Sequence, residues 1–66
     1  MDFKVGQILI AKKKFLYNGE NSLIVDKEYP IKLMLNFCDS LIISSEYSQT
    51  HVFKFDEVEK YFTIKQ

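Results

Sequence analysis

The amino-acid sequence predicts an all-β domain built from short strands. Stretches rich in β-branched and apolar residues recur at intervals of about 8–12 residues, and turn-forming residues separate them. One helical pattern stands near the C-terminus, directly before a last apolar stretch. Five strands, a long first loop and a short helical turn, α or 3₁₀, before the last strand are typical of a small SH3-like barrel. An OB-type barrel is the second alternative, because it usually needs longer strands and a longer chain.

Composition limits the chain to one domain that covers residues 1–66. A chain of this length buries only about 60% of the surface that its unfolded form exposes, so its core must be dense. The sequence supplies such a core, since 47% of its residues are hydrophobic and it contains six Phe and four Tyr. This content argues against disorder.

The charges balance at nine against nine, and every cation is a lysine. Dedicated nucleic-acid-binding domains usually carry a basic excess. Arginine is also the side chain best suited to bidentate recognition of phosphate, guanine or carboxylate. The neutral total and the absence of arginine therefore argue against a domain dedicated to nucleic acid.

The first third of the chain predicts a strand and then a loop. Residues 7–13 are rich in β-branched side chains and form the expected strand. Residues 14–22 are mostly polar, and Asn18-Gly19 is the strongest turn signal in the chain. Because the flanks of this dipeptide are polar, we expect a longer surface loop rather than a tight hairpin. The loop carries Phe15, Leu16 and Tyr17.

The central stretch, residues 23–35, organises the predicted fold. Leu23-Ile24-Val25 returns the chain to the core, and Asp26-Lys27-Glu28 forms a charged turn. Strict alternation then predicts a strand with one buried face. Pro30 suits an edge strand or a first strand position, where no hydrogen-bond donor is needed. The buried face consists of Tyr29, Ile31, Leu33 and Leu35.

The last third predicts a hairpin, a helical turn and a final strand. Residues 40–44 and 50–55 form the hairpin, and the second of these strands places His51, Phe53 and Phe55 on one face. Asp56 followed by Glu59 resembles a helix N-cap with its capping-box glutamate, which predicts helical turns over residues 57–61. Residues 62–64 form the last strand.

The pattern Phe3…Gly6, Leu23-x-x-x-Lys27-x-Tyr29-x-Ile31, His51-x-Phe53 and Tyr61-Phe62 covers nearly the whole chain. It resembles small single-domain SH3-like proteins of phages, prophages and mobile elements, mostly of unknown function. The resemblance implies the fold, a phage-like origin and a role in blocking host machinery. It brings no catalytic residues. The sequence departs from the pattern at Asp26-Lys27-Glu28, where such families often have glycine, and this predicts a different or milder turn.

Residues capable of catalysis or metal binding form no convincing set. His51 lacks an acid and a nucleophile at a defined spacing, so we interpret it as a structural histidine. Cys38 has no neighbouring cation that would activate its thiol. Asp56, Glu57 and Glu59 lack the convergent oxygens of a calcium or magnesium site. We therefore expect a non-enzymatic protein without a metal or cofactor.

The polar first loop is the predicted binding surface. A protein partner is expected to contact its aromatic and apolar side chains together with nearby lysines. The predicted contact residues are Phe15, Leu16, Tyr17, Tyr47, Lys13 and Lys14. The alternative is single-stranded nucleic acid, with Lys12-Lys13-Lys14 along the phosphates and Phe15 and Tyr17 stacked on bases. An edge strand could also pair with a second copy and form a homodimer.

The sequence also bears on localisation. Cys38 is the only cysteine, which excludes an internal disulfide and fits a reducing compartment. The first residues lack the basic-then-apolar order of a signal peptide. The longest uncharged apolar run, Ile8 to Ala11, is too short to span a bilayer. We therefore expect a soluble cytoplasmic protein, in the host cytoplasm if it is phage-encoded.

Overall fold

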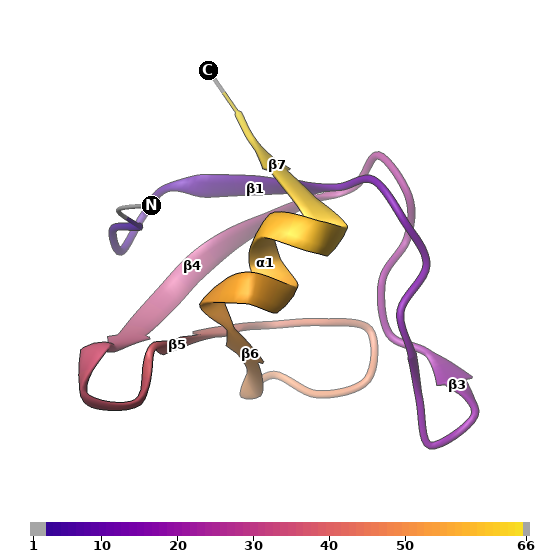
Figure 1. Ribbon diagram of the computed structural model, residues 1–66. Coiled ribbons are helices and arrows are strands. Elements are labelled where there is room, and N and C mark those ends of the chain that lie inside the picture. The colour runs from indigo at the N-terminus through magenta and orange to yellow at the C-terminus, as the bar shows by residue number, and fades with distance from the viewer. Residues whose placement is uncertain (1–2, 66) are drawn as a thin grey trace.

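The computed structural model describes residues 3–65 and shows a five-stranded antiparallel sheet that curls into a half-barrel (Figure 1). The strands follow the order β6-β5-β4-β1-β7, and β2 and β3 form a separate hairpin. The prediction of a mostly β fold is confirmed. The elements are β1 (Ile8–Ala11), β2 (Leu16–Tyr17), β3 (Glu20–Asn21), β4 (Glu28–Leu35), the 3₁₀ turn η1 (Asn36–Cys38), β5 (Ser40–Ile43), β6 (His51–Lys54), α1 (Phe55–Tyr61) and β7 (Phe62–Ile64).

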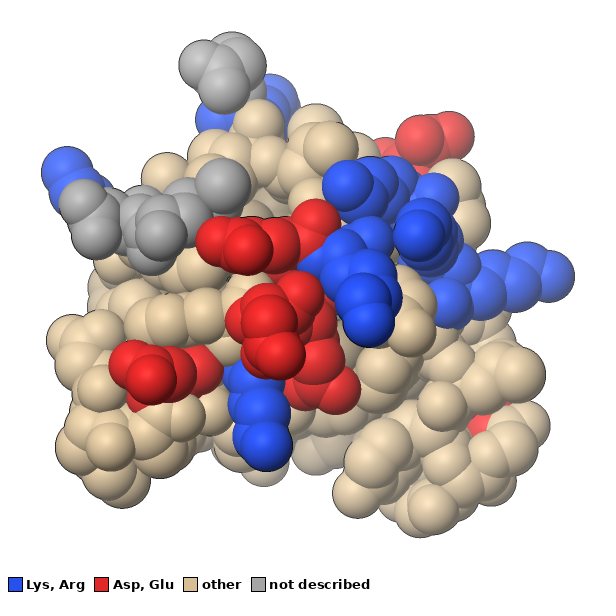
Figure 2. Space-filling model, viewed as in Figure 1, with Lys and Arg blue, Asp and Glu red and all other residues tan. Residues whose placement is uncertain are grey.

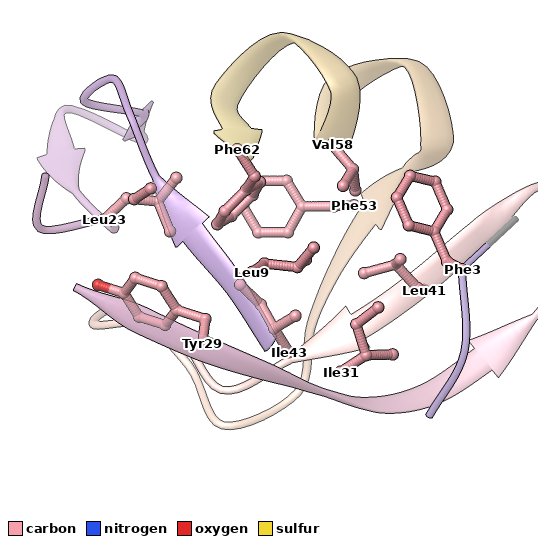
Figure 3. Close-up of a cluster of buried hydrophobic side chains, with 11 residues drawn as sticks. Phe3, Leu9, Leu23, Tyr29, Ile31, Leu41, Ile43, Phe53, Val58 and Phe62 are labelled. Atoms are coloured by element: carbon pink, nitrogen blue, oxygen red, sulfur yellow. The ribbon is translucent and has the colours of Figure 1, made fainter. Parts of the chain in front are cut away.

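The core lies between the concave face of the sheet and α1, which connects the two end strands (Figures 1 and 3). Val58 is the buried residue of α1, and it faces the apolar side chains of the strands. The tight packing of rings and branched side chains supplies the dense core that so short a chain needs. The buried hydrophobic residues are Phe3, Leu9, Ala11, Leu23, Tyr29, Ile31, Leu41, Ile43, Phe53, Val58 and Phe62.

The helix begins earlier than the sequence predicted, and its capping residues differ. The Phe55 ring packs against Phe3 with 5.2 Å between centroids, so the first helical residue already contributes to the apolar side of the structure. Glu57 Oε1 accepts a hydrogen bond from the Lys54 backbone N–H at 3.0 Å. The predicted N-cap at Asp56 with Glu59 as its capping-box partner is therefore wrong, because the helix starts two residues before that cap allows.

Asn18 and Gly19 form a tight hairpin turn, whereas a longer surface loop was expected here. Their φ angles are 52° and 81°, and positive φ at both central residues is the mark of a two-residue type I′ turn. Strand pairing joins Leu16 to Asn21 and Tyr17 to Glu20. All four side chains are exposed, so the polar flanks do not prevent a hairpin that lies on the surface.

A β-bulge interrupts the buried face of β4. Tyr29 and Ile31 are buried as predicted, but the register with β5 shifts between Ile31 and Leu33. The extra residue turns Leu33 outward, where half of its surface is exposed, and Met34 packs against the core instead. The prediction that Leu33 is buried is wrong, because one inserted residue reverses the face of every residue that follows.

Pro30 lies in a central strand rather than in an edge strand. Ile31 donates its backbone N–H to Gln7 of the β1 side at 2.9 Å, so the alternation of the strand directs the Pro30 nitrogen toward the β5 side. Pairing with β5 begins only at Ile31, so no strand partner stands opposite that nitrogen. The expectation that no donor is needed here is correct, although the edge position is not.

The apolar run before β4 contributes a single core residue. Leu23 is fully buried, whereas Ile24 and Val25 are 49% and 42% exposed. Asp26 then takes a φ of 72°, in the left-handed region that favours glycine and tolerates aspartate. Of the two expected alternatives, a different or a milder turn, this φ angle excludes the milder one. Among residues 3–65, no helix has the length and apolar character that a membrane crossing requires.

Candidate interaction surface at two adjoining loops

Two loops that are distant in sequence meet through Tyr17 and Tyr47, here called the tyrosine pair. Their rings lie edge to face, with centroids 4.8 Å apart and planes at 67°. Asn18 Nδ2 donates a hydrogen bond to the Tyr47 hydroxyl at 3.3 Å. Both rings remain about two-fifths exposed, at 42% and 41%. The fold thus brings together two of the predicted site residues and leaves them accessible.

Backbone hydrogen bonds fix the two loops to each other. The Glu46 N–H donates to the Ser22 carbonyl at 2.8 Å and so joins residues 44–50 to residues 12–27. Ser22 is fully buried, and both its N–H and its hydroxyl donate to the Phe15 carbonyl, at 2.9 and 3.0 Å. Hydrogen bonds of the buried Ser22 therefore connect the two loops that carry the tyrosine pair.

A charged group next to Tyr29 connects the same loops. The Tyr29 hydroxyl donates to Glu46 Oε2 at 3.0 Å and accepts the Ile24 N–H at 2.8 Å. Lys27 Nζ forms a salt bridge with the same Glu46 oxygen. Hydrogen bonds from Lys27 and Tyr29 lower the pKa of Glu46, whereas burial is the main cause that raises the pKa of Tyr29. At neutral pH the carboxylate is ionised and the phenol is protonated, as this geometry requires.

Phe15 belongs to the edge of the core rather than to the exposed surface. Its ring centroid lies 5.0 Å from that of Phe53 and 4.9 Å from that of Tyr61. The side chain is half-buried and packs against the buried cluster. Removing this ring would disturb the core, so its effect on binding cannot be separated from its effect on folding.

The remaining predicted site residues lie in the same loop but differ in their surroundings. Leu16 is 67% exposed and precedes Tyr17 in β2. Lys13 and Lys14 are exposed, and within residues 3–65 neither takes part in a salt bridge. The Lys12 N–H donates to the Tyr61 carbonyl, which places the lysine run beside the C-terminal end of α1. Among residues 3–65, no side-chain hydrogen bond, salt bridge or cation–π contact joins these lysines to the tyrosine pair.

Charge is unevenly distributed over the viewed face of the molecule. Figure 2 shows acidic side chains gathered over α1, which carries Asp56, Glu57 and Glu59, and lysines gathered beyond the end of β1. The tan lobe over the β2–β3 hairpin carries few charged atoms in this view. The hairpin region is therefore less charged than the helix region.

His51 lies beneath the tyrosine pair and is 8% exposed. Ser45 Oγ accepts the N–H groups of Tyr47 and Ser48 at 3.1 and 3.2 Å, and it lies 2.8 Å from His51 Nδ1. The Ser45 hydroxyl also lies 3.4 Å from the Ser48 carbonyl oxygen, to which it can donate, so the direction of the Ser45–His51 hydrogen bond depends on the imidazole tautomer. Burial lowers the pKa of His51, and the Glu57 carboxylate opposes this shift.

A hollow of about 230 Å³ lies between the tyrosine pair and β6. Its lining contains no charged residue, and Val52 in its wall is 48% exposed. Sequence reasoning assigned no binding role to Val52 or His51. In the sequence, Val52 could have been recognised as a candidate because it is an apolar residue in a strand that directly follows a polar turn. The lining residues are Tyr17, Tyr47, Ser48, Thr50, His51 and Val52.

The other residues considered for chemistry lie elsewhere. Cys38 is exposed in η1, and its Sγ lies 3.6 Å from the Leu35 carbonyl oxygen. Within the described part of the chain, no three His, Cys, Asp or Glu side chains gather in a way that could hold a metal ion. The hollow at the tyrosine pair is lined by two of the predicted site residues, Tyr17 and Tyr47.

No protein-family model matches the chain, and searches of curated proteins and of solved structures gave no significant match.

Proposed function

We propose that the protein is a non-enzymatic binding module whose partner is another protein. The observation that carries the proposal is the tyrosine pair, two rings from distant loops that are packed together and still exposed. Tyrosine is enriched among the residues that contribute most binding energy at protein interfaces. Leu16, 67% exposed in the same hairpin, adds apolar surface beside the pair.

The rigidity of the two loops supports this function. Association costs less when the contact residues are ordered before binding. The Glu46–Ser22 and Ser22–Phe15 hydrogen bonds hold the loops in the free protein. The rings are thus presented in a fixed geometry that a partner does not have to impose.

We also propose that the domain is an SH3-like barrel. Counted along the chain, the five sheet strands have the spatial order fourth, third, second, first, fifth. A long loop follows the first strand, and a helix joins the fourth strand to the fifth. These features support the assignment. An experimental structure of the protein would test it, and a close superposition on solved SH3-like barrels is the expected result.

Pull-down from a cell lysate with mass spectrometry tests the proposed function. The baits are the wild-type protein, the double variant Tyr17→Ala/Tyr47→Ala and the control Phe37→Ala. Phe37 is 88% exposed in η1, so its removal subtracts an exposed ring without touching the tyrosine pair. A partner retained by the wild type and the control but lost from the double variant supports the proposal. Partners that bind all three baits equally would contradict it.

The lysine run favours single-stranded nucleic acid as the second candidate. Lys12, Lys13 and Lys14 are exposed and, within residues 3–65, form no salt bridge. Figure 2 shows lysines gathered in this region. Binding to a labelled oligonucleotide should weaken steeply with salt, because lysines on phosphates release counterions. Fluorescence anisotropy at low salt checks this candidate, and an absence of binding there would remove it.

A further inference from the structure

The end strand β6 presents one free pair of backbone hydrogen-bonding groups. Phe55 donates its N–H to the Asp39 carbonyl at 2.8 Å, and the register pairs Phe53 with Leu41. Backbone groups of successive residues in an antiparallel strand point to opposite sides. Those of Phe53 and His51 therefore face β5, and those of Val52 face away from the sheet.

The neighbouring outward N–H groups are already satisfied. Lys54 donates its N–H to Glu57 Oε1 at 3.0 Å, and Thr50 donates its N–H to Ser48 Oγ at 3.2 Å. Side-chain partners thus protect the strand on both sides of Val52, as edge strands commonly require. Among the hydrogen bonds described for residues 3–65, none satisfies the outward groups of Val52.

The hollow at the tyrosine pair lies on this edge. His51 and Val52 of β6 both line it, although consecutive strand residues point to opposite faces of a sheet, and Thr50 of the preceding turn lines it as well. A space that touches both strand residues lies beside the strand. No β5 residue lines it, so it lies on the open side, where the Val52 N–H and C=O point.

We propose that an extended, uncharged segment of a partner protein enters this hollow and pairs with Val52 as an additional strand. This inference rests on the proposed function, since the tyrosine pair forms the outer wall. One partner residue would exchange two hydrogen bonds with Val52, and its neighbours would contact the rings, as in other cases of strand addition.

The lining determines the chemistry of the occupant. A charged side chain would lose water without meeting an opposite charge, because no charged residue lines the hollow. The exposed Val52 side chain and the two rings instead favour β-branched or aromatic side chains. A second copy of the protein fits this edge less well. In each copy the β2–β3 hairpin lies beside β6 through Tyr17, so pairing of β6 with β6 would press the two hairpins against each other.

A yeast-displayed library of random dodecapeptides is the probe. We expect the wild-type protein to select peptides that share an uncharged stretch rich in β-branched or aromatic residues. Synthetic versions are then scanned with single backbone N-methyl groups against the wild-type protein. Methylation at the residue paired with Val52 should weaken binding about tenfold, which corresponds to about 1.4 kcal/mol, and its two neighbours should tolerate it.

A proline substitution in the protein tests the same hydrogen bond from the other side. Val52→Pro removes an N–H that points away from β5, so the sheet keeps its ladder, and peptide binding should fall about tenfold. The matched control is Val52→Thr, which keeps the backbone N–H and a β-branched side chain at the same exposed position and should retain peptide binding. If Val52→Pro fails to fold, the N-methyl scan on the wild type decides.

The outcomes separate this inference from the proposed function. Loss of binding in Tyr17→Ala/Tyr47→Ala, together with indifference to N-methylation and to Val52→Pro, would overturn strand pairing and leave the tyrosine surface intact. A library that yields no peptide, or only peptides with charged centres, would also overturn it. A dimer in sedimentation that Val52→Pro dissociates would assign the edge to a second copy and overturn it as well.

Discussion

The Tyr29 hydroxyl donates a hydrogen bond to Glu46 Oε2 at 3.0 Å, although the two residues are 17 positions apart in the sequence. Tyr29 is buried in β4, whereas Glu46 belongs to the loop that carries Tyr47. The same hydroxyl accepts the Ile24 N–H from the loop that carries Tyr17. One phenol therefore connects the core to both loops of the candidate surface.

Replacing Tyr29 with Phe should lower the free energy of unfolding by about 1 kcal/mol, the usual net value of a protein hydrogen bond. The ring stays, so the core keeps its volume, while the Ile24 N–H and the Glu46 carboxylate lose a partner. Urea unfolding followed by circular dichroism measures the change. An unchanged midpoint would show that water replaces the hydroxyl at no cost.

The Glu46 carboxylate should make stability fall in acid. Hydrogen bonds from Lys27 and Tyr29 lower its pKa in the folded protein below the ordinary value of 4.5. As the pH falls below that value, the unfolded chain takes up a proton before the folded chain does, and folding becomes less favourable. Urea unfolding at pH 7, 5 and 3 checks this prediction. Glu46→Gln should be less stable at pH 7 and lose less stability between pH 5 and pH 3. Equal losses in both proteins would contradict the prediction.

The β4 bulge predicts opposite outcomes for two neighbouring apolar residues. Ile31→Ala should cost about 3 kcal/mol, because the side chain is 2% exposed and its removal leaves a cavity. Leu33→Ala should cost less than about 0.5 kcal/mol, because Leu33 is half exposed on the outer face. Chemical unfolding of the two variants provides the comparison. Similar losses would mean that Leu33 is buried and that β4 keeps regular alternation.

The same bulge shows why the sequence predicted the strands better than their faces. Apolar and β-branched stretches located β1, β5, β6 and β7 to within a few residues, since local pattern determines where a strand forms. Alternation then placed Leu33 beside Ile31, because nothing in the sequence marks one inserted residue. The bulge follows from pairing with β5, a long-range relationship that local pattern does not contain.

The candidate surface was predictable in part for the same reason. Tyr17 and Tyr47 stood out as aromatic residues in polar loops, and the structure places them in contact. Phe15 stood in the same polar context, yet it packs against Phe53 at the edge of the core. The residues in these loops look alike in sequence, and only long-range contacts, such as those of Phe15 with Phe53 and Tyr61, distinguish a covered ring from an exposed one.

His51 should make stability fall already in mildly acidic solution. Burial lowers its pKa in the folded protein below the ordinary value of 6.5, although Glu57 opposes the shift. As the pH drops below 6.5, the unfolded chain binds a proton first, so stability is full above this pH and declines toward the folded pKa. The decline caused by His51 begins at a higher pH than the decline caused by Glu46, because the ordinary pKa of histidine lies above that of glutamate.

The His51 titration can be followed directly, because the chain contains one histidine. In proton NMR, the His51 Cε1–H resonance should titrate below pH 6.5, and unfolding experiments between pH 7.5 and 5 should show falling stability. His51→Gln removes the titrating group and should flatten that slope, whatever its effect on absolute stability. A midpoint above 6.5 would mean that the Glu57 carboxylate outweighs burial, and stability would then rise as the pH falls through this range.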